Sequence, residues 1–335
     1  MLSRRIFTAL AGGIPLASLT PYGLAQSSSS DYPNKAIRIV VPFNAGGPVD
    51  IIARSLGARL APLIKQAVIV DNKGGASTII GTDNVVKSAP DGYSLLLVGS
   101  GARSILPAIT KLPYDPERDL QAVSLAVASP QIFVISPQLA AKLAVKGVTN
   151  LKTLTAYAQA NPGKLNMGSV GAGTITSLVG ELYKREQSLK VVDVPFRGGA
   201  PAVQALMAGD IDLLMADVAA VIPQIQGGKI VGLAVTDSKR AKELPGVQSV
   251  VEAGYPSLVA VNAYCLFAPA KTPRDVVAKI QKAVTAALAT PELRTQFEKS
   301  GMQAVGSTSE ELEKLLQAQT TKWTPLARAL GVRIE

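Results

Sequence analysis

Residues 36–50 read AIRIVVPFNAGGPVD, and the order of elements in this stretch recurs along the chain. Residues 36–43 are mostly apolar and predict a β-strand. Residues 49–60 predict a helix, because Ile51, Ile52, Leu56 and Leu60 fall on one face at helical spacing. A turn with two glycines joins the strand to the helix. A strand that leads through such a turn into an amphipathic helix is typical of α/β proteins.

The same alternation continues to residue 236. Further strands are predicted at residues 67–70, 93–98, 132–136, 164–167, 191–194, 211–215 and 232–236, and helices at 81–88, 151–160, 176–186, 201–208 and 218–226. Two longer helices follow at 273–289 and 309–330. The uncharged stretch 120–141 predicts two buried strands joined by a turn, because Pro130, Pro137 and several Ser and Gln residues interrupt it. Together these elements predict an α/β fold with βαβ crossovers.

The composition indicates a folded protein with either one large domain or two of ordinary size. The chain has 335 residues, of which 47% are apolar and 17% charged, so it can bury a large core. Aromatic residues make up only 4%, which argues against a surface that stacks nucleic-acid bases. The net charge is +10, but the basic residues are dispersed and their longest cluster is residues 239–242. We therefore expect no nucleic-acid partner.

The scarcity of histidine and cysteine excludes several kinds of chemistry. The chain has no histidine, which rules out Ser-His-Asp and Cys-His catalysis and histidine metal ligands. Cys265 is the single cysteine, so no intramolecular disulfide can form, and its apolar neighbours predict that it is buried. Asp210 and Asp212 lie on one face of a strand, but we interpret them as part of a solvated turn. We expect no catalytic residue and no bound metal.

The N-terminus has the features of an export signal over residues 1–25. A basic head with Arg4 and Arg5 precedes a mostly apolar run at residues 6–19. Gly23 and Ala25 are small residues at the −3 and −1 positions of a cleavage site. Cleavage after Ala25 would leave Gln26 as the first residue. Residues 3–7 also resemble the twin-arginine pattern, so the general and the twin-arginine routes both stay open. Cleavage lowers the net charge from +10 to +8. We expect a periplasmic protein that is not inserted in a membrane.

Three junctions between a strand and a helix are rich in glycine and hydroxyl residues. They cover residues 43–50, 99–104 and 168–176. In open α/β sheets such junctions lie at the carboxyl ends of strands, where helix N-termini present N–H groups to ligands. The junctions therefore predict an anion site. None of them completes a nucleotide-binding motif, so we expect no cofactor.

Many short motifs in order carry a resemblance to a known family. They are VVPF at 40–43 with Gly46, Gly47 and Asp50; APDGY at 89–93; LPYDP at 112–116; PGKLN at 162–166; Gly171 and Gly173-Thr174; Gly198 and APA at 200–202; LAVT at 233–236; and LFAP at 266–269. With them the chain resembles the substrate-binding proteins of tripartite tricarboxylate transport systems, often called the Bug family. The resemblance extends over residues 32–335.

The resemblance implies a two-lobed periplasmic-binding-protein fold, type II-like, in which each lobe is a mixed, mostly parallel sheet flanked by helices. The chain would cross between lobes near Ala128 and Asn262. Lobe one would hold residues 32–128 and 262–335, and lobe two residues 129–261. The lobes would close on a small carboxylate, aliphatic or aromatic and often a dicarboxylate. A monomer would deliver this ligand to the membrane components of a transporter.

The resemblance also implies which residues bind the ligand. The first glycine loop supplies Phe43, Asn44, Ala45, Gly46, Gly47 and Asp50, and the second supplies Gly171, Ala172, Gly173, Thr174 and Thr176, with Asp217 in another loop. In the remaining junction we expect Ser100 and Arg103. Arg103 has two interpretations, a cation that pairs with the ligand in the cleft or a solvated surface residue.

Several positions depart from the family pattern. Ser77-Thr78 replace a frequent Gly-Gly pair, Ser177 replaces a frequent His, and Tyr264-Cys265 replace a frequent Trp-Phe pair. Smaller side chains widen the cleft, which favours an aromatic acid without excluding an aliphatic one. Arg197 stands where the family often has Lys, and we expect it on the surface.

A second class of function stays open beside ligand binding, an enzyme or a sensor-associated protein that acts on the same anionic metabolite. The absence of histidine and the scattered carboxylates weigh against the enzyme.

Overall fold

The computed structural model describes residues 31–144, 150–196 and 198–331. The predicted signal peptide and Arg197 lie outside the described residues. Within the described ranges, no helix combines the length and the apolar character that crossing a membrane requires.

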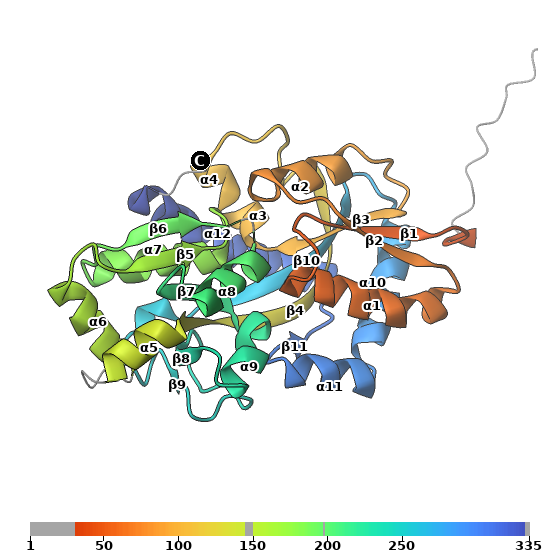
Figure 1. The fold of residues 1–335 in the computed structure, drawn as a ribbon. Helices are drawn as coiled ribbons and strands as arrows, with labels where there is room; N and C mark the ends of the chain where they lie inside the picture. Colours follow the sequence, from red (N-terminus) through yellow and green to blue (C-terminus); the bar gives the residue numbers. More distant parts are fainter. Residues whose placement is uncertain (1–30, 145–149, 197, 332–335) are drawn as a thin grey trace, which may run out of the picture. The chain divides into compact units, whose positions relative to one another are not determined.

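Strands and helices alternate over most of the chain (Figure 1). The strands are β1 (Ile37–Val41), β2 (Val68–Asn72), β3 (Ser94–Gly99), β4 (Leu120–Ile135), β5 (Asn166–Ser169), β6 (Val192–Pro195), β7 (Leu213–Asp217), β8 (Val231–Val235), β9 (Gln248–Ser249), β10 (Val261–Pro269) and β11 (Gln303–Ala304). The helices are α1 (Pro48–Ile64), α2 (Ile79–Val86), α3 (Gly101–Ser104), α4 (Leu106–Ile109), α5 (Pro137–Ala144), α6 (Leu151–Ala160), α7 (Ile175–Glu186), α8 (Gly199–Ala208), α9 (Val218–Gln226), α10 (Arg274–Leu288), α11 (Pro291–Lys299) and α12 (Ser309–Leu330). Short 3-10 turns at Ala76–Thr78 and Pro256–Leu258 complete the set. The predicted α/β fold is confirmed.

In the described part of the chain, eleven strands form one sheet whose main order is β2-β1-β3-β10-β4-β7-β5-β6. β1 lies parallel to β2 and β3, and β5 lies parallel to β6 and β7. The long strands β10 and β4 run antiparallel to their neighbours between these two groups (Figure 1). The sheet is therefore mixed, with a parallel group toward either end. The predicted lobe boundaries stay predictions.

The prediction of two strands joined by a turn at residues 120–141 is wrong, because β4 is continuous over residues 120–135 and α5 follows it. β4 pairs with β10 over residues 120–130 and with β7 and β8 over residues 131–135. Pro130 lies at the end of the β10 ladder, where a residue without an N–H is tolerated. Pro137 is the first residue of α5, a position that suits proline.

The polar residues of β4 do not break the strand, because their side chains have buried partners. The Ser124 hydroxyl donates to the carbonyl of Ser307 at 2.8 Å, and the Ser129 hydroxyl donates to Asp217 at 2.7 Å. A buried hydroxyl with a hydrogen bond costs little, whereas one without a partner is expensive. The sequence shows the serines but not their distant partners, so the strand was divided in error.

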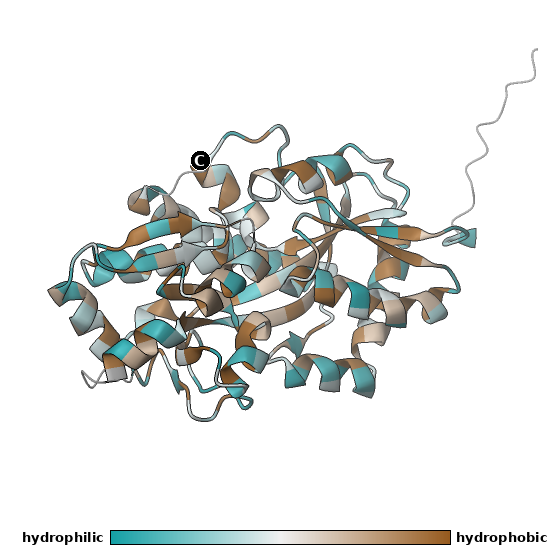
Figure 2. Ribbon diagram, in the orientation of Figure 1, coloured by the Kyte–Doolittle hydropathy of each residue, from teal (hydrophilic) through white to brown (hydrophobic). Residues whose placement is uncertain are grey.

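The core follows the strands. Leu95, Leu96 and Leu97 of β3 are fully buried, as expected for a parallel strand that is covered on both faces. Cys265 of β10 is also fully buried, which confirms its prediction as an apolar core residue. Figure 2 shows hydrophobic residues along the strands and hydrophilic residues over α11.

The long C-terminal helix confirms its predicted bounds, residues 309–330. Thr308 caps it, since its hydroxyl accepts from the Glu311 N–H, and Gly331 ends it with φ +67°. Helix α11 was missed. It is short and mostly polar, and only Leu293 and Phe297, one turn apart, are buried.

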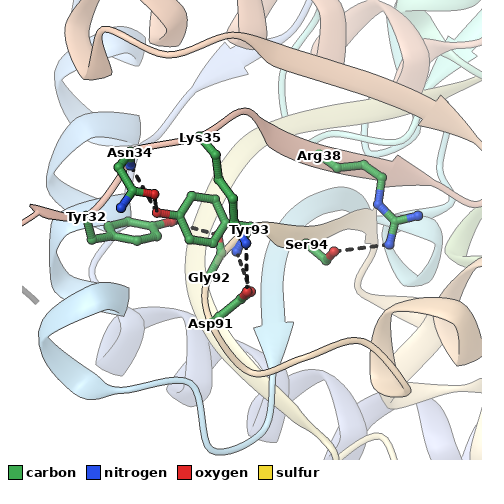
Figure 3. A network of polar contacts seen from close by, with 8 residues as sticks. All are labelled: Tyr32, Asn34, Lys35, Arg38, Asp91, Gly92, Tyr93 and Ser94. Atoms are coloured by element: carbon green, nitrogen blue, oxygen red, sulfur yellow. Dashed lines mark hydrogen bonds and ion pairs between the residues drawn. The ribbon is translucent and has the colours of Figure 1, made fainter. Parts of the chain in front are cut away.

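A polar cluster attaches the first described residues to the turn before β3 (Figure 3). The Tyr32 hydroxyl donates to the carbonyl of Gly92 at 2.7 Å, and the Tyr32 and Tyr93 ring centroids are 4.9 Å apart. The Lys35 ammonium lies 4.2 Å from the Tyr93 ring centroid and 3.3 Å from Asp91. These contacts fix the start of β1, whose carboxyl end leads into the first glycine loop.

Candidate functional site

A cavity lies where the first glycine loop, which follows β1, meets the second glycine loop, which follows β5. It encloses about 70 Å³, several times the space that one water molecule needs. Seven of the predicted ligand-binding residues line it: Phe43, Asn44, Gly47, Gly173, Thr174, Thr176 and Asp217. The other seven do not: Ala45, Gly46, Asp50, Ser100, Arg103, Gly171 and Ala172. The predicted loops are thus brought together, but only part of each faces the cavity.

Helices α1, α2, α7, α8 and α9 begin at this cavity. Its lining includes the first helical residues Pro48, Ile175 and Gly199, and the N-cap residues Thr78 and Asp217. A helix N-terminus carries a partial positive charge and N–H groups without intrahelical partners. Several of them around one cavity create a positive potential that favours an anion.

No lysine or arginine side chain lines the cavity among the residues that the structure describes. Asp217 is the one carboxylate in that lining. An anion in the cavity would therefore meet backbone N–H groups, hydroxyls and the Asn44 and Asn262 amides rather than a formal positive charge.

Asp50 holds the first glycine loop in place from outside the cavity. Its carboxylate accepts from the Gly46 N–H at 2.9 Å and from Arg54 at 3.0 Å. Arg54 also donates to the Asn72 side chain at 3.0 Å, and Asn72 donates to the carbonyl of Phe43 at 3.2 Å. Burial acts to raise the pKa of Asp50, but the hydrogen bonds from Arg54 and Gly46 hold the pKa below its ordinary value.

The second glycine loop is closed by its own hydroxyl groups. The Thr174 hydroxyl donates to the carbonyl of Gly171 at 2.9 Å and accepts from the Ser177 N–H at 3.1 Å, so Thr174 caps α7. Ser177 also donates to Gly171, at 2.8 Å. Gly171 and Gly173 have φ values of +110° and +80°, which glycine adopts without strain. Thr174 lines the cavity, but its hydroxyl is already used within the loop.

Asp217 organises the opposite wall. One carboxylate oxygen accepts from the Ser129 hydroxyl at 2.7 Å and from the Ala219 N–H at 3.0 Å, and the other accepts from the Tyr264 hydroxyl at 2.5 Å. The Asn262 side chain donates to the Tyr264 oxygen at 3.1 Å. Burial raises the pKa of Asp217, although these hydrogen bonds act in the opposite direction. With its oxygens occupied, Asp217 orients Tyr264 and Asn262 and begins α9.

A buried glutamine joins this wall to α7. The Thr176 hydroxyl donates to the Gln131 side-chain oxygen at 2.5 Å, and Gln131 is fully buried in β4. The Gln131 N–H donates to Thr236 at 2.8 Å. Thr176 therefore lines the cavity while it links the start of α7 to the central strand.

Arg103 fits neither of its two sequence interpretations. Its guanidinium donates to both carboxylate oxygens of Glu313 on α12, at 2.8 and 2.7 Å, and its side chain is only 10% exposed. Such a two-bond pair holds the planar guanidinium in one orientation. Sequence reasoning missed Glu313, because it lies 210 residues away from Arg103. The neighbouring Ser100 is fully buried and its N–H donates to the carbonyl of Ala263 at 2.8 Å.

The turn before α2 has an unusual backbone. Ala76, Ser77 and Thr78 have φ values of +45°, +48° and +80°, in the left-handed region. Such a conformation costs about 1–2 kcal/mol for each residue other than glycine. The sequence shows that Ser77 and Thr78 replace a frequent Gly-Gly pair. It does not show that these two residues adopt a backbone conformation that is strained for residues other than glycine. Ser77 and Thr78 both line the cavity.

Other lining residues were missed as site residues, although the sequence carried signals for them. Tyr264 was noted only as a departure from the family pattern, and Asn262 only as a crossing point between lobes. Residues 198–201 at the start of α8 belonged to a matching motif but were not assigned to the site.

Gly101 and Gly173 lie in close contact beside the cavity. A Cβ atom on Gly101 would lie 2.4 Å from the carbonyl oxygen of Gly173, which no real contact allows. A Cβ atom on Gly173 would lie 2.1 Å from the Leu106 side chain. These glycines are required because the α3 junction and the second glycine loop touch there.

Comparisons with known proteins agree with this geometry. A family model described as "Tripartite tricarboxylate transporter family receptor" matches residues 52–332. A UPF0065 protein from the tcbD-tcbE intergenic region of Pseudomonas sp. is 33% identical over 94% of this chain and 91% of its own length. Protein BugT of Bordetella pertussis is 30% identical over 93% of this chain and 95% of its own length.

Solved structures show the same fold. The periplasmic binding protein BugD is 31% identical with a TM-score of 0.83, over 90% of this chain and 99% of that one. An R. palustris protein solved with adipate is 27% identical with a TM-score of 0.84, over 90% and 99% of the two chains. MatC of Rhodopseudomonas palustris with bound malate is 28% identical with a TM-score of 0.82, over 88% and 100%. The two-lobed periplasmic-binding-protein fold is thus confirmed.

The close contact at Gly101 gives a first prediction. Gly101→Ala places a methyl group against the Gly173 carbonyl, so the two loops must separate and ligand affinity should fall at least tenfold. Gly246→Ala is the matched control, because its Cβ would have no heavy atom within 4 Å and Gly246 does not line the cavity. Both variants are first shown to be folded, and calorimetric titration with an acid that binds wild type then measures the affinity of each. Equal affinities would contradict the prediction.

A second prediction concerns pH. The pKa of Asp50 is lower in the folded state than its ordinary value of 3.8, so its ionised form stabilises the protein above about pH 4. This contribution is lost as the pH falls through the folded-state pKa. Asp50→Asn should lower the free energy of unfolding by about 1–3 kcal/mol at pH 7, and the difference from wild type should shrink below pH 4.

Urea unfolding of wild type, Asp50→Asn and the exposed control Asp210→Asn between pH 7 and pH 3 measures this effect. The control should stay within about 0.5 kcal/mol of wild type at every pH. A difference between wild type and Asp50→Asn that is constant down to pH 3 would show that the charge of Asp50 does not stabilise the loop.

Proposed function

Because the chain belongs to the tripartite tricarboxylate transporter receptor family, we propose that it is a periplasmic solute-binding protein that captures a small carboxylate. The family is one of receptors, and the protein is not an enzyme. The observation that supports a carboxylate as the ligand is the group of helix N-termini around the cavity. These N-termini supply hydrogen-bond donors and positive potential where an anion would lie.

Two relatives support a dicarboxylate. The R. palustris protein was solved with adipate and MatC with malate, and both ligands carry a carboxylate at each end. In this chain the cavity lining includes residues from the start of α1 and from the start of α7. We propose that one carboxylate is held at the first glycine loop and the other end of the ligand at the second.

The ligand would enter between two lobes that then close. We propose residues 32–128 and 262–335 as one lobe and residues 129–261 as the other. Cavity-lining residues come from both, which supports this assignment. Export through the predicted signal peptide, with cleavage near Ala25, would place the protein in the periplasm. There it would act as a monomer and pass its ligand to the membrane components of a tripartite tricarboxylate transporter.

A panel of acids tests the proposal. Malate, adipate and the aromatic acid phthalate are added separately to the protein, and the thermal midpoint and calorimetric affinity are measured. At least one acid should raise the midpoint, because a ligand that binds only the native state stabilises it. The bound acid should be recovered unchanged after incubation. A diamide of the same skeleton should not bind, and the absence of binding by every acid would contradict the proposal.

Two variants separate backbone binding from charge pairing with the same panel. Gly47→Val puts a branched side chain on a residue that lines the cavity, so affinity should fall about ten- to a hundredfold. Arg103→Ala should leave affinity within about threefold of wild type, because Arg103 is paired with Glu313 away from the cavity lining. The reverse result would show that charge pairing governs the site.

A further inference from the structure

The turn at Ala76–Thr78 holds an unused hydrogen-bonding group at the edge of the cavity. Thr78 is only 5% exposed, and its hydroxyl has no hydrogen-bond partner among the residues that the structure describes. The residue also lines the cavity. A buried hydroxyl without a partner is unfavourable, so it is expected to find one when the site is filled.

We propose that Thr78 is a specificity-determining residue whose hydroxyl donates a hydrogen bond to an oxygen atom at one end of the bound carboxylate. This inference rests on the proposed function, because it assumes that the cavity holds a carboxylate. It adds a side-chain donor at the start of α2 to the donors of the two glycine loops.

Thr78 differs from Thr174 and Thr308, which also stand at a helix N-terminus. A threonine at an N-cap normally accepts a hydrogen bond from the first turn of its own helix. Thr174 does so at the start of α7, and Thr308 does so at the start of α12. Thr78 is the N-cap of α2 but makes no such bond. Its hydroxyl is therefore not used to stabilise the helix.

The backbone of Thr78 gives a second, independent reason. Its φ of +80° is rare for a β-branched side chain, and glycine would adopt it without strain. Strained residues of this kind concentrate at ligand sites, where the surrounding structure holds them in place. Threonine in this conformation therefore makes the folded protein less stable than glycine would. Unlike glycine, it provides a hydroxyl group at the cavity.

Three variants of Thr78 test the role of the hydroxyl, with the acid from the panel that binds wild type most tightly. Thr78→Val keeps the branched shape and removes the hydroxyl, so its affinity should fall about tenfold. Thr78→Ser keeps the hydroxyl and should stay within about threefold of wild type. Thr78→Gly should also bind about tenfold more weakly, while its thermal midpoint without ligand should rise because the strain is relieved.

Thr82→Val is the matched control. Thr82 lies on α2 one turn after Thr78 and is fully buried, but it does not line the cavity, so this variant should bind like wild type. Affinities are measured by calorimetry after each variant has been shown to be folded by circular dichroism.

The outcomes separate this inference from the proposed function. If wild type binds an acid and Thr78→Val or Thr78→Gly binds it equally well, the inference is wrong and the proposed function stands. If Thr82→Val weakens binding as much as Thr78→Val, the effect is a general one of α2 and the inference is again wrong. If wild type binds none of the acids, the proposed function fails and the inference fails with it.

Discussion

The structure depends on the convergence of helix N-termini at one cavity that has no formal positive charge in its described lining. Each helix that begins there leaves N–H groups without intrahelical partners, and these groups need an acceptor. The mixed sheet produces this arrangement, since parallel strands in both groups lead through short turns into helices that start at the same place. A carboxylate would satisfy the N–H groups and the positive potential together.

The ionisable side chains near the cavity hold its walls rather than fill it. Asp50 binds the Gly46 N–H, Asp217 binds Tyr264, and Arg103 binds Glu313. Each pair fixes a loop or a helix start, so the donors that face the cavity are already oriented before a ligand arrives. Such preorganisation reduces the entropy that binding must overcome. It also explains why two residues lie outside the lining: Asp50, which the family resemblance assigned to the ligand, and Arg103, for which the sequence left ligand pairing as one of two interpretations.

Local patterns predicted most of the fold. Half of the predicted ligand-binding residues line the cavity, and distant contacts account for the rest. Helices α6, α9 and α12 have the bounds that their apolar spacing predicted. β4 was divided in error because the partners of its serines lie far away in the sequence. The glycine loops were found from composition, but which loop residues face the cavity depends on three-dimensional contacts. The left-handed backbone of Ser77 and Thr78 has no sequence signature other than the missing glycines.

A crystal structure of the protein with its tightest-binding acid tests the central claim most directly. The account predicts carboxylate oxygens within about 3.2 Å of backbone N–H groups at the starts of α1 and α7. It also predicts no lysine or arginine nitrogen within about 4 Å of either carboxylate. A ligand carboxylate in a two-bond pair with an arginine, with the helix N-termini left to water, would contradict the account.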